Sequence, residues 1–201
     1  MFDLDVAIKV CRSASVEHAL ALAKRHEKHE HCLSILTEDK QNFCEAVEYI
    51  RNLTFSDAES NLKKYGIILM QQCPNETTEL VNEMCTNFRS HTNDVELFDK
   101  TNEIDRSNPE EFVHLFANVP DRLIDFLEHL TRNLSSCEQF VYNTLIELYL
   151  GCWKENKMAE NRLLEILVSN SEMYDKSQAL ILCRMYSFWP GILHIYEEQK
   201  L

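Results

Sequence analysis

Residues 55–70, FSDAESNLKKYGIILM, hold the pattern that decides the fold. Apolar side chains recur there every three or four residues, the spacing that gathers them on one face of an α-helix. The members of this stripe are Phe55, Ala58, Leu62, Tyr65 and Leu69. Ser56 and Glu59 stand in the register of a capping box, which pairs two backbone N–H groups left over at a helix start. The stretch therefore predicts a helix that opens at this pair.

The same spacing predicts helices on both sides of this stretch. Towards the N-terminus it predicts four short helices, over Val6–Ala14, Val16–Arg25, Glu30–Glu38 and Phe43–Leu53. Towards the C-terminus there are three further stripes, namely Leu123, Phe126, Leu127 and Leu130; Val141, Leu145, Leu148 and Cys152; and Ala179, Leu182, Cys183 and Tyr186. The start signals before these stripes are Pro120, the capping-box pair Ser135 and Glu138, and the cap Asp175. About ten or eleven helices are predicted in all.

Only 3 Gly and 4 Pro are present. Strand-rich folds use both residues at their turns, so the composition predicts an all-α chain without strands. A weak internal repeat favours an α-solenoid of stacked antiparallel helical hairpins, because a small residue one turn after an aromatic lets the next helix approach closely. The two copies are Phe43, Ala46, Val47, Ile50 and Phe188, Gly191, Ile192, Ile195. An irregular helical domain stays open as the alternative.

We expect residues 1–201 to form a single segment of this solenoid. One stretch, residues 91–108, departs from the periodic pattern because it is polar and acidic, with only scattered apolar residues. It is predicted to be a flexible loop between helices. It ends at Ser107, Asn108 and Pro109, which have the residue types of a helix start.

Composition excludes several classes of partner. The formal net charge of -13 opposes binding to nucleic acid or to anionic lipid, which Lys and Arg recruit. Apolar runs extend over only a few residues, against the roughly 20 needed to cross a bilayer, and the N-terminus lacks the features of a signal peptide. We therefore expect a cytoplasmic protein, without direct membrane insertion, whose 8 Cys remain free thiols in a reducing compartment.

No motif predicts catalysis, a cofactor or a metal. His26, His29, His31 and Cys32 are the one cluster that suggests zinc, but no Cys-x-x-Cys pair accompanies them and a helix C-terminus explains cationic residues there. The carboxylate pairs Glu110–Glu111 and Glu197–Glu198 are interpreted as solvated surface. The aromatic residues that could line a groove are interpreted first as packing; they are Trp153, Phe188, Trp189 and Tyr196. No catalytic, cofactor-binding or metal-ligating residue is assigned, and the chain is not expected to be an enzyme.

Several stretches in chain order resemble the vacuolar protein sorting-associated protein 11 family, a class C core subunit of the HOPS and CORVET tethering complexes. They are residues 2–10, residues 58–66 with 68–70, Glu110–Phe112, Phe116–Asn118 with Pro120, Phe126–His129, Ala179–Leu180 with Leu182–Cys183, and Tyr196–Glu197 with Lys200–Leu201. None is diagnostic alone. Together they cover essentially the whole chain and imply a solenoid related to the clathrin heavy-chain repeat.

The resemblance implies a scaffold that acts in vesicle docking and fusion, and in autophagy, peripherally on late endosome and lysosome or vacuole membranes. Its implied partners are the other class C and HOPS/CORVET subunits, and indirectly Rab GTPases and SNAREs. The family's N-terminal propeller and C-terminal zinc-binding RING are not expected within these residues, so no ubiquitin-ligase activity is assigned to them. Two alternatives stay open: another coat or tether subunit of the clathrin type, or a tetratricopeptide-type peptide-binding adaptor.

Overall fold

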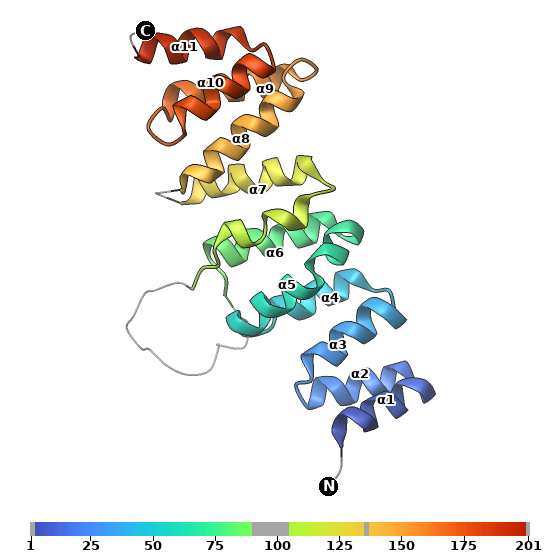
Figure 1. The fold of residues 1–201 in the computed structure, drawn as a ribbon. Helices are drawn as coiled ribbons and strands as arrows, with labels where there is room; N and C mark the ends of the chain where they lie inside the picture. Colours follow the sequence, from blue (N-terminus) through green and yellow to red (C-terminus); the bar gives the residue numbers. More distant parts are fainter. Residues whose placement is uncertain (1–2, 90–104, 135–136, 200–201) are drawn as a thin grey trace, which may run out of the picture. The chain divides into compact units, whose positions relative to one another are not determined.

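The computed structural model describes residues 3–89, 105–134 and 137–199. Across these residues the regular elements are the α-helices α1 to α11, with one π-helix and two 3-10 helices and no strand, as the sequence predicts (Figure 1). Residues 91–104 of the predicted acidic loop lie outside them. No helix in the described ranges is both long and apolar enough to span a bilayer.

The chain divides into two compact units, residues 1–122 and residues 123–201, which are described separately. The prediction of a single segment over residues 1–201 stays a prediction.

Unit 1 consists of helices, and connections of no more than three residues join those from α1 to α6. Its elements are α1 (Leu4–Ala14), α2 (Val16–Arg25), α3 (His29–Ser34), the π-helix η1 (Ile35–Asp39), α4 (Phe43–Arg51), α5 (Phe55–Gln72), α6 (Pro74–Thr86) and the 3-10 helices η3 (Pro109–Glu111) and η4 (Val113–Phe116). The four predicted N-terminal helices are confirmed within two residues at each end, with the third divided into α3 and η1. Helix α6 packs on both α5 and α4, the contact with nearest and next-nearest helices that is typical of stacked repeats.

The predicted start of α5 lies two residues too late along the chain. Thr54 caps the helix instead of Ser56: its hydroxyl accepts the Asp57 N–H at 3.3 Å and donates to the Asp57 carboxylate at 2.7 Å. Because the helix begins at Phe55, that ring lies within the first turn and packs edge-on against Phe88 at 5.9 Å between centroids. Tertiary contact thus favours the earlier of two overlapping start signals.

The face of α5 predicted to be apolar forms the core of unit 1. Ala58, Leu62 and Leu69 are completely buried. Gly66 lies where η4 approaches, since a Cβ added there would stand 2.8 Å from Cδ1 of Leu115. The absence of a side chain at this position therefore sets how closely η4 lies against α5.

Unit 2 contains two stacked helical hairpins. Its helices are α7 (Pro120–Asn133), whose first turn contains the division between the units, α8 (Gln139–Cys152), α9 (Lys157–Ser169), α10 (Lys176–Met185) and α11 (Trp189–Gln199). Helix α8 packs on α9 and α10, and α11 packs on α9 and α10. The pair α8–α9 thus stacks on the pair α10–α11 (Figure 1).

The predicted start signals of unit 2 have mixed outcomes. The carboxylate of Asp175 caps α10 by accepting two backbone N–H groups at 2.8 and 3.0 Å, as predicted. Pro120 is the first residue of α7, also as predicted. Glu138 is itself the N-cap of α8 and makes no side-chain cap bond, so its predicted place inside the first turn is wrong. Its proposed partner Ser135 lies outside the described residues.

The last three positions of the internal repeat are buried in both copies, whereas the first is half-buried at Phe43 and completely buried at Phe188. Ala46, Val47 and Ile50 are fully buried in α4, and Gly191, Ile192 and Ile195 are buried in α11. A Cβ on Gly191 would lie 2.7 Å from Phe188 Cδ1, 2.9 Å from Cys183 Sγ and 3.0 Å from Leu167 Cδ1. The small residue therefore does permit the close helix contact that the repeat predicts.

Candidate protein-interaction surface

A groove in unit 2 lies at the end of α10 and along α11. Its volume is about 410 Å³, and we call it the Trp189 groove. The residues that line it are Arg184, Ser187, Trp189, Ile192 and Tyr196. Trp189 is 67% exposed, and Leu193, which lies one turn further along α11 but does not line the groove, is 60% exposed. The groove therefore presents apolar surface to solvent, next to a single cationic side chain.

The turn between α10 and α11 places Trp189 on the outside. Ser187 adopts the left-handed conformation with φ 58°. The N–H of Ser187 donates to the carbonyl of Arg184 at 3.1 Å, and that of Phe188 donates to the carbonyl of Cys183 at 2.8 Å. This is the Schellman arrangement, in which the residue after the left-handed position turns back onto its own helix. Phe188 consequently enters the core, and its neighbour Trp189 faces away from it.

The four aromatic residues singled out in the sequence separate into two groups. Phe188 is completely buried and packs edge-on against Trp153, with ring centroids 5.1 Å apart. Trp189 and Tyr196 line the groove, where the Arg184 guanidinium lies 5.6 Å from the Tyr196 ring centroid. The interpretation as packing is right for the first pair and wrong for Trp189. Trp, Tyr and Arg are the residue types enriched where protein partners bind most strongly.

A second cavity of unit 2, of about 200 Å³, has Glu128 in its lining. The Glu128 carboxylate accepts a short hydrogen bond from the Tyr149 hydroxyl, pairs with Arg132 at 2.6 Å and lies 3.8 Å from Arg162. Burial, and then this carboxylate, raise the pKa of the Tyr149 hydroxyl, which stays protonated. These contacts join α7, α8 and α9, so we interpret the cluster as a polar clamp between helices.

The histidine cluster of unit 1 does not converge on one point. His29 Nδ1 shares a hydrogen bond of 2.9 Å with the Tyr49 hydroxyl, while His31 Nε2 lies 3.4 Å from the Asp5 carboxylate. Cys32 is completely buried, which raises the pKa of its thiol, and His26 is the exposed C-cap of α2. Each of these four side chains thus has surroundings or contacts that it does not share with the other three.

The two carboxylate pairs lie at the surface as interpreted. Glu111 forms an ion pair with Lys63 at 2.5 Å, and Glu198 forms one with Lys176 at 3.4 Å. Glu110 and Glu197 are exposed. These contacts tie neighbouring elements together. Each lysine also pairs with a second glutamate, Lys63 with Glu59 and Lys176 with Glu172, both at 3.4 Å.

The fold assembles one group of metal-binding residue types that the sequence pattern does not predict. Cys44, Cys73 and Glu76 place their ligand atoms within 4.8 Å of one another in unit 1. The spacing of Cys73 and Glu76 in a Cys-x-x-Glu run at the start of a helix was the only local signal. Cys44 is remote in sequence, and only the packing of α4 on α6 brings it near.

Comparison with known proteins places these features in a family. The model of the PEP5/VPS11 clathrin repeat matches residues 1–201. The chain belongs to the PEP5/VPS11 clathrin-repeat family. Its fold class is therefore the all-α solenoid of this repeat, as the helical pattern and the resemblance predict.

Curated members of the family align along the entire chain. The vacuolar protein sorting-associated protein 11 homolog of Homo sapiens is 41% identical over 209 residues, and that of Mus musculus is 40% identical over 209 residues. The homolog of Dictyostelium discoideum is 30% identical over 255 residues. In each case all of this chain is covered, but only 22% to 26% of the relative. The chain thus spans only about a quarter of the length of these relatives.

Proposed function

We propose that this chain is a scaffold segment of a multi-subunit vacuolar sorting complex of the HOPS/CORVET type, acting in vesicle docking and fusion at endosomes and the lysosome or vacuole. The match of the PEP5/VPS11 repeat over residues 1–201 carries the proposal, because the curated relatives are named as vacuolar protein sorting proteins. The proposed role is structural, with no chemical step.

The architecture supports a role in binding proteins. Stacked hairpins expose the outer faces of successive helices, so a partner contacts several elements at once and gathers many weak contacts. The net charge of -13 disfavours nucleic acid and anionic lipid as partners and leaves proteins as the favoured class. Rab GTPases and SNAREs would then be reached indirectly, through other class C subunits bound to this scaffold.

The Trp189 groove, together with the adjacent exposed Leu193, is the surface that we propose for one such contact. Trp189 and Leu193 stand one helical turn apart on α11, and both are more than half exposed. A partner that covers them removes their apolar surface from water, while the adjacent Arg184 gives direction to an approaching acceptor. Energetically dominant contacts usually centre on such an aromatic anchor.

Affinity purification tests the proposal. The tagged chain is expressed in its source cells, and co-purifying proteins are identified by mass spectrometry. We expect the other class C subunits to be recovered with the wild-type chain. Recovery of clathrin light chains or chaperones, with no class C subunit, would refute the assignment to this complex.

A matched pair of variants separates the groove from the scaffold role. We expect Trp189→Ala combined with Leu193→Ala to reduce recovery of at least one subunit several-fold. Met158→Ala is the control, since Met158 is 68% exposed on α9 and does not line the groove. Equal recovery with both variants would remove the groove from the proposal while leaving the scaffold role standing.

A further inference from the structure

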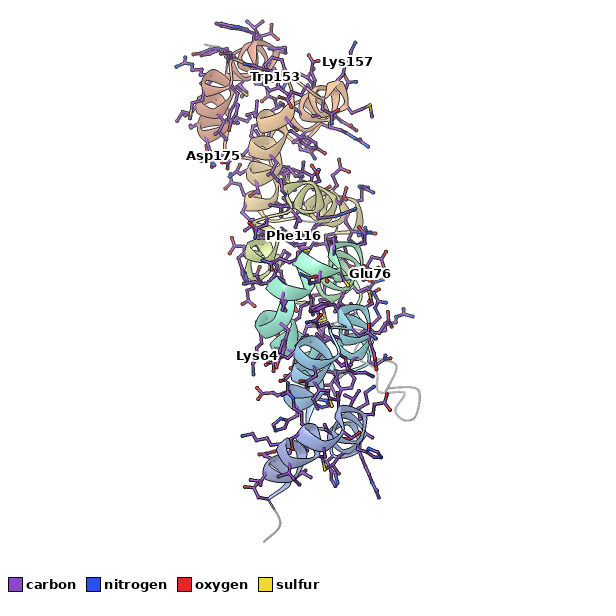
Figure 2. All side chains as sticks on the ribbon, turned by 90° about the vertical axis from the view of Figure 1, so that its right-hand side faces the viewer. Lys64, Glu76, Phe116, Trp153, Lys157 and Asp175 are labelled. Atoms are coloured by element: carbon purple, nitrogen blue, oxygen red, sulfur yellow. The ribbon has the colours of Figure 1, made fainter. Side chains whose placement is uncertain are left out.

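Three side chains with metal-binding atoms meet in unit 1 between α4 and α6. The Sγ atoms of Cys44 and Cys73 lie 3.0 Å apart, and a carboxylate oxygen of Glu76 lies within 4.8 Å of both. Cys44 stands in the first turn of α4, while Cys73 and Glu76 flank the start of α6. Figure 2 shows Glu76 at the edge of this unit. Two thiols and one carboxylate thus share one small volume.

Local structure explains why Cys73 faces this volume. Pro74 occupies the first position of α6 and donates no backbone N–H, and the Cys73 side chain makes no cap bond to the helix. The thiol is therefore available to face Cys44 on the neighbouring helix. Cys73 is buried, whereas Cys44 and Glu76 are exposed, so the group is closed on one side and open to solvent on the other.

We propose that Cys44, Cys73 and Glu76 bind a thiophilic divalent cation, with Zn²⁺ as the biological occupant. Thiolate and carboxylate are both ordinary zinc ligands, and three protein ligands with water in the fourth position make an open tetrahedral site. On binding, the cation takes the place of the two thiol protons, which pass to solvent. The site does not depend on the proposed function.

The geometry needs only a small adjustment. Tetrahedral coordination with Zn–S bonds of about 2.3 Å separates two sulfurs by about 3.8 Å, so the sulfurs must move apart by roughly 0.8 Å. A side-chain rotation of Cys44 supplies that movement, because the residue is exposed at the beginning of a helix. The backbone of the buried partner Cys73 stays in place.

The carboxylate favours a cation over a disulfide between the same two sulfurs. A disulfide is uncharged, so it does not attract the carboxylate of Glu76. A divalent cation does attract it, and two thiolates and one carboxylate around the cation leave a net charge of about -1. A disulfide would also require the sulfurs to approach to about 2.05 Å, in the opposite direction of movement. The three side chains are therefore better suited to binding a cation than to forming a disulfide between Cys44 and Cys73.

Titration of the fully reduced chain with Co²⁺ tests the site. Cobalt bound by thiolates in a tetrahedron has a sulfur-to-metal charge-transfer band and intense d–d bands, and Zn²⁺ displaces it. We expect one Co²⁺ per chain for the wild type. Cys44→Ser and Cys73→Ser should lower the affinity by at least tenfold, and Glu76→Gln should lower it about tenfold with the thiolate band retained.

Two control variants keep the result specific. Cys11→Ser removes a half-exposed thiol of α1, and Glu79→Gln removes an exposed carboxylate one turn further along α6. Both should bind Co²⁺ like the wild type, and circular dichroism checks that every variant is folded. Exposure of Cys44 makes its variant the one least able to disturb the fold.

Three results would overturn the proposal. The first is no stoichiometric binding by the reduced wild-type chain. The second is a Co²⁺ affinity of Cys44→Ser equal to that of its control Cys11→Ser, or a Co²⁺ affinity of Glu76→Gln equal to that of its control Glu79→Gln. The third is a chain whose intact mass shows a Cys44–Cys73 disulfide and which, once reduced, binds no metal; that result would assign the two thiols to redox chemistry.

Discussion

Replacing Gly191 by Ala tests the close packing of α11 in unit 2. The added methyl gains about 1 kcal/mol in helix propensity but meets three atoms at 3.0 Å or less, which belong to Phe188, Cys183 and Leu167. Phe188 is completely buried with Trp153 packed on it, so its ring has little room to yield. Overpacking of this kind costs about 1–3 kcal/mol. We therefore expect a net loss of up to about 2 kcal/mol in the free energy of unfolding.

Gly151 is the matched control for this experiment. It also lies in a helix of unit 2, but a Cβ there would meet nothing within 4 Å. Gly151→Ala should therefore stabilise the unit by about 0.5–1 kcal/mol. The chain has 2 Trp, Trp153 and Trp189, and both lie in unit 2, so tryptophan fluorescence during urea denaturation reports this unit. If the Gly191→Ala chain were as stable as the Gly151→Ala chain, the tight packing around Gly191 would be refuted.

Three further changes follow from the described contacts. Thr54→Ala should cost about 1 kcal/mol of unfolding free energy and Ser56→Ala nearly nothing, as measured by chemical denaturation followed by circular dichroism; equal losses would contradict the cap at Thr54. Phe188→Ala should cost about 3–5 kcal/mol and Trp189→Ala less than about 0.5 kcal/mol in the same assay, because only the first ring is in the core. Burial holds the pKa of His129 below its ordinary value of 6.5. As the pH falls below that value, the unfolded chain takes up a proton at His129 before the folded chain does. The folded state is therefore destabilised relative to the unfolded state as the pH falls, whereas above pH 6.5 this loss is absent. Wild-type stability should therefore drop more between pH 7.5 and 5 (roughly the titration range) than that of His129→Gln, and equal drops would exclude this residue as the cause.

The helical elements of both units follow from local signals. The predicted helix Val16–Arg25 has the bounds of α2, and Asp175 caps α10 as predicted. Such signals are readable because the periodicity of apolar residues and the hydrogen bonds of a cap involve only neighbours within a turn or two. The two errors at helix starts, before α5 and α8, arise where two possible starts lie two or three residues apart. At α5 the contact between Phe55 and Phe88 favours the earlier start.

The candidate sites were less predictable for a physical reason. Cys44 and Cys73 are brought together by the packing of α4 on α6, a contact between residues 29 positions apart. Phe188 and Trp189 are neighbours of similar character, and no pattern of period three or four tells which ring is buried. The left-handed turn at Ser187 and the packing of Phe188 on Trp153 decide it.

The sequence by itself therefore determined that this chain is helical, and it gave the bounds of the four N-terminal helices to within two residues. These properties come from backbone hydrogen bonds and side-chain spacing within single helices. Only the tertiary structure decided that Trp189 faces solvent while Phe188 is buried, and that two cysteines and a glutamate of different helices meet. Both outcomes depend on how helices pack against each other, and packing energy is shared among residues that the sequence keeps apart.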